Sequence, residues 1–320
     1  MGANKRTGIF FFLRLSATFI ILYLVFLKVD FKNFSSVFLK LNFGLIVIAF
    51  LIYVLQFIIS TIKWRQLVNF LGVKLKFIFY LKLNLIGLFY ATIMPGGLIA
   101  GDLVKGYRVF KTSQDRRALI NAIFMDRITG FTGLLLSIVA IYFFGGAEGF
   151  PYLRELTVIS AIALFLFFCF LLFFGKTKAY LMKMTGKINP RIANILEKIF
   201  AAVSAYLKNI HLLILAIGIG ILIYLVNAAV VYALAGAAGI KISFADIFIV
   251  NCLANFALIV APITFFGFGI RESFFVYFLG SIGLARESAL LLSLSFGVIS
   301  LTLSLLGGII EGANLFVKKT

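Results

Sequence analysis

Long apolar runs set the strongest limit on how this 320-residue chain can fold. A helix needs about 20 mainly apolar residues to cross a bilayer. Six runs approach or exceed that length, at 9–27, 43–62, 118–144, 157–174, 211–235 and 289–310. The first is too long for the apolar region of a signal peptide and has no A-x-A-like cleavage site, so it also predicts a span.

The composition supports an all-α polytopic membrane protein. Hydrophobic residues make up 63% and charged residues 13% of the chain, whereas soluble domains contain about 45–50% and about 25%. These values exclude a soluble enzyme, a disordered chain and a disulfide scaffold. The net charge of +19 comes from basic residues between apolar runs, so it does not indicate a nucleic-acid-binding module. Cys169, Cys252 and a single His211 lack the spacing of a metal site, and we expect no metal and no cofactor.

Two further apolar stretches are interrupted. The run at 78–94 breaks and resumes to 109, and the run at 247–261 breaks and resumes to 279. Proline removes a backbone donor, and glycine loosens a helix. Irregular backbone at membrane depth survives only inside protein or beside a wet cavity. Both stretches therefore predict broken or re-entrant helical hairpins, with tips at Pro95, Gly96, Gly97, Pro262, Gly267 and Gly269.

The basic residues predict the orientation. With the N-terminus inside, most Lys and Arg residues fall in cytoplasmic segments, and both termini are cytoplasmic in the cell membrane. The first hairpin then enters from the cytoplasm and the second from outside. The largest polar segment, 175–210, is cytoplasmic, and its apolar stripe over 189–210 predicts an interfacial helix.

The two hairpins suggest a weak inverted repeat within one domain, 1–320, with halves at about 78–144 and 245–311. When Pro95 is aligned with Pro262, Asn84 falls on Asn251. Past the tips, Asp102 matches Glu272 after a three-residue insertion. Paired interrupted segments in opposite orientations are typical of a transporter site near the membrane midplane.

Several charges lie inside the predicted spans, at about 2.5–3.5 kcal/mol each. They are Asp102, Asp126, Arg127, Arg271, Glu272 and Glu311. Because adjacent residues on a helix do not face each other, we expect pairing across the repeats. The hypothesis places Arg127 near Glu272 or Asp102, and Arg271 near Asp126. These pairs could hold the broken helices together or bind substrate, and the sequence favours neither.

Two helix faces carry small and polar residues, over 126–137 and 293–311. Such faces allow close helix packing, and a groove for a polar headgroup is the alternative. The chain has no Walker A motif and no hydrolase or kinase signature. We therefore expect neither an ATPase nor an enzyme.

The hairpin motifs resemble a known family. The first reads MPGGLIAGD over 94–102 and continues with Lys105, Arg108 and DRITG at 126–130; the second reads PITFFGFGIRE over 262–272, followed by Gly283 and Gly307-Gly308. They resemble the lysylphosphatidylglycerol synthase transmembrane-region family, which includes the flippase domain of multiple peptide resistance factor proteins. The resemblance implies lipid movement between leaflets. It does not imply synthase activity, because the sequence stops at Thr320 before any synthase domain. Bulky Phe265, Phe266 and Phe268 depart from the family pattern.

The expected function is flipping of a phospholipid or aminoacylated phospholipid. Cations at Lys105, Arg108, Arg127 and Arg271, together with helix ends at the tips, would bind phosphate. Asp102, Asp126 and Glu272 would balance them or bind a cationic headgroup, with Asn84 and Asn251 as further polar contacts. We expect Arg271→Gln to abolish translocation and leave expression intact.

Three alternatives remain. The chain could carry a polyprenyl-phosphate-linked sugar or glycolipid. It could be a membrane transferase that uses Asp102 and Glu272, or a non-transporting partner of a separate lipid synthase. A homo-oligomer is also compatible with the sequence.

Overall fold

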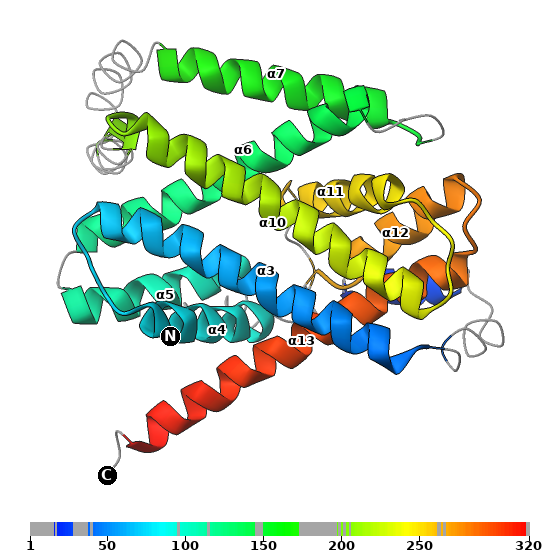
Figure 1. Ribbon diagram of the computed structural model, residues 1–320, viewed down its shortest axis with the longest axis horizontal. Helices are drawn as coiled ribbons and strands as arrows, with labels where there is room; N and C mark the ends of the chain where they lie inside the picture. The colour runs from blue at the N-terminus through cyan, green and yellow to red at the C-terminus, as the bar shows by residue number, and fades with distance from the viewer. Residues whose placement is uncertain are drawn as a thin grey trace.

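The computed structural model describes residues 41–94, 97–113, 116–144, 150–172, 206–260 and 267–317, most of 16–27, and residues 38, 197, 200, 203, 204 and 264. These residues form α-helices joined by short connections, with no strand among them (Figure 1). The predicted all-helical architecture is confirmed. Of the predicted span at 9–27, residues 18–26 are described and helical, whereas most of the interfacial segment at 175–210 lies outside the described residues.

Two long helices, α3 (Phe43–Phe70) and α10 (Ile210–Ala237), pack side by side through the middle of the molecule (Figure 1). Each begins at an asparagine whose side chain accepts a backbone N–H of the first turn, Asn42 from Leu45 and Asn209 from Leu212, both at 3.2 Å. Such caps satisfy donors that have no partner within the helix. The predicted runs at 43–62 and 211–235 are therefore helices, and α3 continues beyond its run into buried Lys63 and Trp64.

Each interrupted run folds as two helices that pack against each other. The first gives α4 (Phe77–Ile93) and α5 (Leu98–Ser113); the second gives α11 (Phe244–Val260) and α12 (Ile270–Ser281). Gly97, Gly267 and Gly269 have φ of +55°, +78° and +91°, values that glycine adopts without steric cost. Pro95, Gly96 and Pro262 lie outside the described residues. Figure 1 shows the two hairpins at opposite ends of the molecule.

The remaining long helices are α6 (Arg116–Phe144), α7 (Leu153–Leu172) and α13 (Arg286–Val317). α7 packs on α6 at one edge of the molecule and exposes large apolar side chains such as Phe165 and Leu166. α13 crosses both hairpins, packing against α4 and α12. An apolar core formed by α3, α6, α10, α11, α12 and α13 fills the centre.

Within the described residues, four helical segments are long and apolar enough to cross a membrane. They are Phe43–Phe70, Asn121–Phe143, Ile210–Ala237 and Arg286–Ala313. Together with the outward-facing apolar side chains, they support a multi-pass membrane protein.

The same succession of helices occurs twice along the chain. Helices α3 to α6 have 28, 17, 16 and 29 residues, and helices α10 to α13 have 28, 17, 12 and 32. The packing partners also correspond, because α4 packs on α13 and α11 packs on α6. The correspondence therefore adds α3 and α10 to the predicted repeats at 78–144 and 245–311.

Candidate functional site

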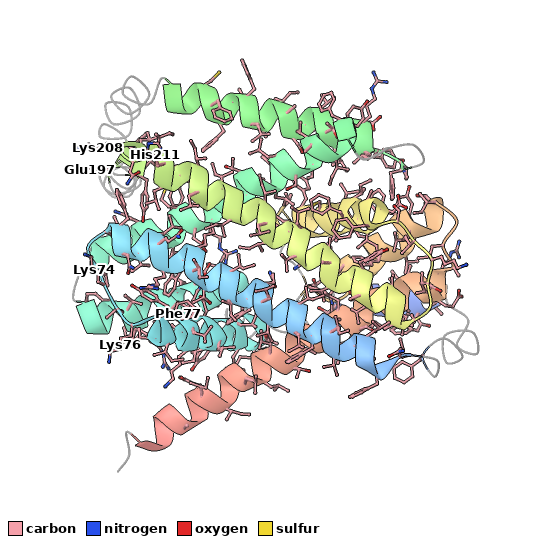
Figure 2. The ribbon with its side chains drawn as sticks, viewed as in Figure 1. Lys74, Lys76, Phe77, Glu197, Lys208 and His211 are labelled. Atoms are coloured by element: carbon pink, nitrogen blue, oxygen red, sulfur yellow. The ribbon has the colours of Figure 1, made fainter. Side chains whose placement is uncertain are left out.

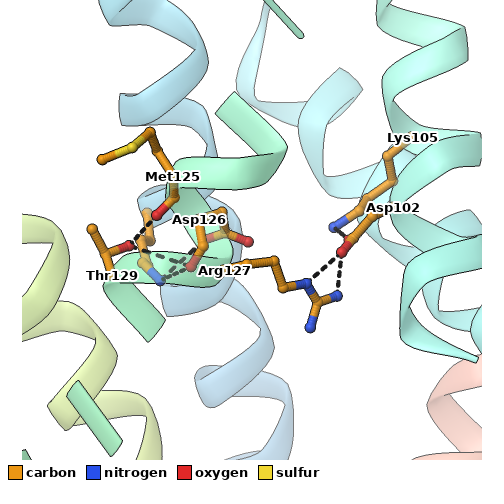
Figure 3. Close-up of polar contacts among 7 residues, drawn as sticks. Asp102, Lys105, Met125, Asp126, Arg127 and Thr129 are labelled. Carbon is orange, nitrogen blue, oxygen red and sulfur yellow. Dashed lines mark hydrogen bonds and ion pairs between the residues drawn. The ribbon is translucent and has the colours of Figure 1, made fainter. Parts of the chain in front are cut away.

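Asp102 lies at the centre of the main polar cluster. It occupies the second turn of α5, and its Oδ1 is 2.7 Å from Lys105 Nζ one turn along the same helix. From α6, Arg127 Nε donates to Asp102 Oδ2 at 2.6 Å (Figure 3). One of the two partners predicted for Arg127 is thus confirmed. Asp102 is buried, whereas the Arg127 side chain is 42% exposed.

A second ion pair belongs to this cluster. Lys63 of α3 is buried, and its Nζ is 3.0 Å from both Asp126 Oδ1 and the Asp126 backbone oxygen. Asp126 also lies within electrostatic reach of Lys105 and Arg127. We call Lys63, Asp102, Lys105, Asp126 and Arg127 the α5–α6 charge cluster. The expectation that Asp126 pairs with Arg271 is wrong. Asp126 pairs with Lys63 of α3, and Arg271 pairs with Glu272.

Lys105 has a second neighbour that sequence reasoning missed. Its Nζ lies over the ring of Trp64, 5.1 Å from the centroid, a cation–π geometry. Its aliphatic stem passes beside Gly87 of α4, where a Cβ would lie 2.7 Å from Lys105 Cγ. Gly87 therefore makes room for the lysine inside the hairpin.

Arg108, farther along α5, forms a salt bridge with Glu311 of α13. Tyr90 of α4 donates a hydrogen bond to Glu311 Oε1 at 2.9 Å. These contacts connect the first hairpin to α13. The sequence around Arg108 and Glu311 did not indicate that they pair.

The second hairpin holds its own buried pair. Arg271 Nη2 is 3.1 Å from Glu272 Oε1. Ser293 of α13 contacts both side chains, accepting from Arg271 Nε at 3.1 Å and donating to Glu272 Oε1 at 2.9 Å. Arg271 also lies over the rings of Phe268 and Phe296, 5.5 and 5.0 Å from their centroids.

This geometry corrects the prediction that Arg271 and Glu272 have different partners because they are adjacent. Glu272 lies at the start of α12, and its Oε2 accepts the backbone N–H of Gly269 at 2.6 Å. Its carboxylate therefore turns back toward the helix end. A Cβ on Gly297 would lie 2.7 Å from Arg271 Nη2, so the absence of a side chain there lets the guanidinium reach the same carboxylate.

The polar face of α13 makes a series of separate polar contacts. Between Ser293 and Glu311, Ser300 Oγ lies 2.7 Å from the Tyr53 hydroxyl and Ser304 Oγ lies 2.8 Å from Thr92 Oγ1. Gly307 approaches the α4 backbone, where a Cβ would lie 2.0 Å from Leu85 O. The face thus combines close packing with a row of hydroxyls from the second hairpin to the first. Tyr53 and Thr92 were not predicted.

The equivalent face of α6 is used for packing. Thr129 and Ser137 donate to backbone oxygens of their own helix at 2.7 and 2.8 Å. A Cβ on Gly133 would lie 3.1–3.2 Å from the backbone of α10 near Gly220. Apart from Asp126, the packing interpretation describes this face.

The hydrogen bonds described for the two aligned asparagines go to uncharged groups. Asn84 donates to Thr61 Oγ1 at 2.9 Å. Asn251 donates to Asn227 Oδ1 at 2.8 Å, and its own Oδ1 accepts from Asn255 at 2.9 Å. Asn84 connects α4 to α3, and Asn251 connects α11 to α10 and to the next turn of α11. This geometry fits a structural role.

Other candidate features lie elsewhere. Among the described side chains, no group of three or more His, Cys, Asp or Glu residues could hold a metal ion. A surface pocket of about 630 Å³ lies between Asn42, the 236–241 turn, Leu284 and Ser288. It contains none of the predicted site residues.

Apolar outward surfaces, helices of membrane-spanning length and buried charges on broken hairpins together define a polytopic helical membrane protein with ion pairs inside an apolar bundle. The chain matches the family model described as the lysylphosphatidylglycerol synthase TM region over residues 11–308, and it belongs to that family. The resemblance inferred from the hairpin motifs is thereby confirmed. Comparison with curated proteins returned no match.

Proposed function

We propose that this protein moves the polar headgroup of a membrane lipid between the two leaflets, and that it does so without catalysis of its own. The observation that carries the proposal is the row of polar contacts inside an otherwise apolar bundle, from Arg271 and Glu272 through the α13 hydroxyls to Arg108 and the α5–α6 charge cluster. Charges in a membrane interior are costly and tend to mark substrate pathways. Membership in a family associated with lipid flipping supports the same reading.

We further propose that the protein spans the cell membrane with both termini in the cytoplasm. Figure 2 shows Lys74, Lys76 and Lys208 near one end of the molecule, where α3 ends and α4 and α10 begin. An excess of basic residues at one end is typical of the cytoplasmic side. In this orientation α4–α5 enters from the cytoplasm and α11–α12 from outside, in addition to the full spans.

The repeated helix succession supports an inverted repeat in this proposal. With Asp102 aligned on Glu272, Gly101 corresponds to Arg271 and Arg127 to Gly297. Each half therefore pairs a hairpin carboxylate with a guanidinium. In the first half the guanidinium comes from the long helix α6, and in the second it comes from the hairpin helix α12. Rocking of such repeats is a common mechanism of alternating access.

Headgroup translocation in liposomes containing the purified protein tests the proposal. The lipids are phosphatidylglycerol, aminoacylated phosphatidylglycerol and a polyprenyl-phosphate sugar, so the glycolipid-carrier alternative is measured in the same experiment. Arg127→Gln is the informative variant, because Arg127 is partly exposed and pairs with the hairpin carboxylate. We expect it to reduce translocation at least about tenfold, since a charge-assisted hydrogen bond contributes about 1.5–3 kcal/mol.

Arg154→Gln is the matched control, because Arg154 is exposed in the first turn of α7, away from the cluster. It should transport normally. Translocation that Arg127→Gln leaves unchanged would remove the charge cluster from the mechanism. If no lipid moves, a membrane partner of a separate synthase becomes the better explanation, and co-purification with that synthase would test it.

A further inference from the structure

We infer that the headgroup recognised by the α5–α6 charge cluster is a net-anionic phosphate headgroup, and that Arg127 is the residue that selects it over zwitterionic and aminoacylated headgroups. This inference rests on the proposed function, and it identifies the chemical class of the lipid.

The first step is the charge of the cluster. Its described members are three cations, Lys63, Lys105 and Arg127, and two carboxylates, Asp102 and Asp126. Lys63 forms an ion pair with Asp126, while Lys105 and Arg127 both pair with Asp102. These five described side chains therefore sum to a net charge of +1 within a bundle of apolar helices. An excess charge among apolar helices is unfavourable unless a counter-charge accompanies it.

The second step is access. Lys63 and Lys105 are held inside the protein, with side chains 4% and 12% exposed, whereas Arg127 is 42% exposed. Figure 3 shows Arg127 extending from α6 toward Asp102 and Lys105 on α5. Its planar guanidinium presents several N–H donors in a geometry that matches phosphate oxygens. An incoming phosphate can thus contact Arg127 while Asp102 stays with Lys105.

The third step compares the headgroups. A phosphatidylglycerol or polyprenyl-phosphate headgroup carries a net negative charge and neutralises the cluster. A zwitterionic headgroup leaves the excess charge in place. A lysylated headgroup adds further positive charge, and like charges repel strongly where the dielectric constant is low. The cluster that attracts an anionic headgroup therefore disfavours a lysylated one.

The chain contains its own reporter for this binding. Trp64 is the single tryptophan, it is buried, and the Lys105 ammonium lies over its ring. Phosphate binding beside Lys105 changes the field at the indole. Selective excitation of tryptophan in the purified full-length protein then follows binding without any transport step.

The experiment titrates four short-chain probes: dihexanoyl phosphatidylglycerol, geranyl phosphate, dihexanoyl phosphatidylethanolamine and dihexanoyl lysylphosphatidylglycerol. We expect a saturable change in Trp64 emission with one or both of the first two, which distinguishes a glycerolipid from a polyprenyl source. The last two should bind at least about tenfold more weakly. Arg127→Gln should remove this preference, and Arg154→Gln should keep it. Native mass spectrometry of retained lipid provides a second measurement that does not depend on Trp64.

Equal or tighter binding of the zwitterionic or lysylated probe overturns the inference, as does the lack of selective anionic binding in both measurements. The liposome assay separates the two proposals. Translocation that prefers aminoacylated phosphatidylglycerol overturns the headgroup class but supports lipid flipping. Selective anionic binding without translocation of any lipid supports the headgroup class and contradicts flipping.

Discussion

At the scale of single residues, Glu272 combines two roles. Its carboxylate accepts the Gly269 backbone N–H and also pairs with Arg271, and the side chains of both members of the pair are almost fully buried. Removal of one partner of a buried ion pair leaves an uncompensated charge, which costs about 3–5 kcal/mol. Because the pair is buried, we now expect Arg271→Gln to reduce stability, and not transport alone.

We predict that Arg271→Gln lowers the thermal unfolding temperature in detergent, because Glu272 remains buried without its cation. Arg271→Gln/Glu272→Gln should recover part of the loss, since a neutral glutamine can still accept from Gly269. Arg154→Gln is the control for loss of a guanidinium at an exposed position. An Arg271→Gln protein that unfolds at the wild-type temperature would contradict the structural role of the pair.

At the scale of helices, glycine sets how closely α4 and α5 approach. A Cβ on Gly101 would lie 2.2 Å from Gly87 O, so even alanine requires the two helices to separate. Small residues allow this kind of close packing between membrane helices. The hairpin geometry that places Asp102 near Arg127 depends on it.

We predict that Gly101→Ala destabilises the protein by at least about 1–3 kcal/mol through overpacking. Gly218→Ala in α10 is the matched control, because no atom beyond its chain neighbours and its own helix backbone lies within 4 Å of its added methyl group and alanine favours helix by about 1 kcal/mol. Unfolding temperatures of the two variants measure the difference. Equal stability would mean that α4 and α5 do not pack this closely.

At the scale of the whole molecule, the proposed inverted repeat predicts that the two hairpins enter from opposite sides. Lys76 precedes α4 and Lys241 precedes α11, and both are exposed. In a background without Cys169 and Cys252, a cysteine at Lys241 should react with an impermeant thiol reagent in intact cells. A cysteine at Lys76 should react only after permeabilisation. Reaction of both from one side would exclude the inverted arrangement.

The sequence by itself determined the class of the protein and most of its elements. Apolar length fixes which segments can cross a bilayer, because unpaired backbone polar groups are too costly there. Proline and glycine at both tips predicted where the hairpins break, and the hairpin motifs identified the family. These features are local, so they can be read without knowledge of the neighbouring helices.

Only the tertiary structure decided the charge partners. The Asp102–Arg127 pair was within the predicted alternatives, but Lys63 with Asp126 and Glu311 with Arg108 join residues 63 and 203 positions apart. Arg271 pairs with its own neighbour because Gly297 leaves space for its guanidinium and Glu272 turns back to Gly269. Partner choice depends on which helices meet and at what depth, and helical periodicity along one segment contains no information about either.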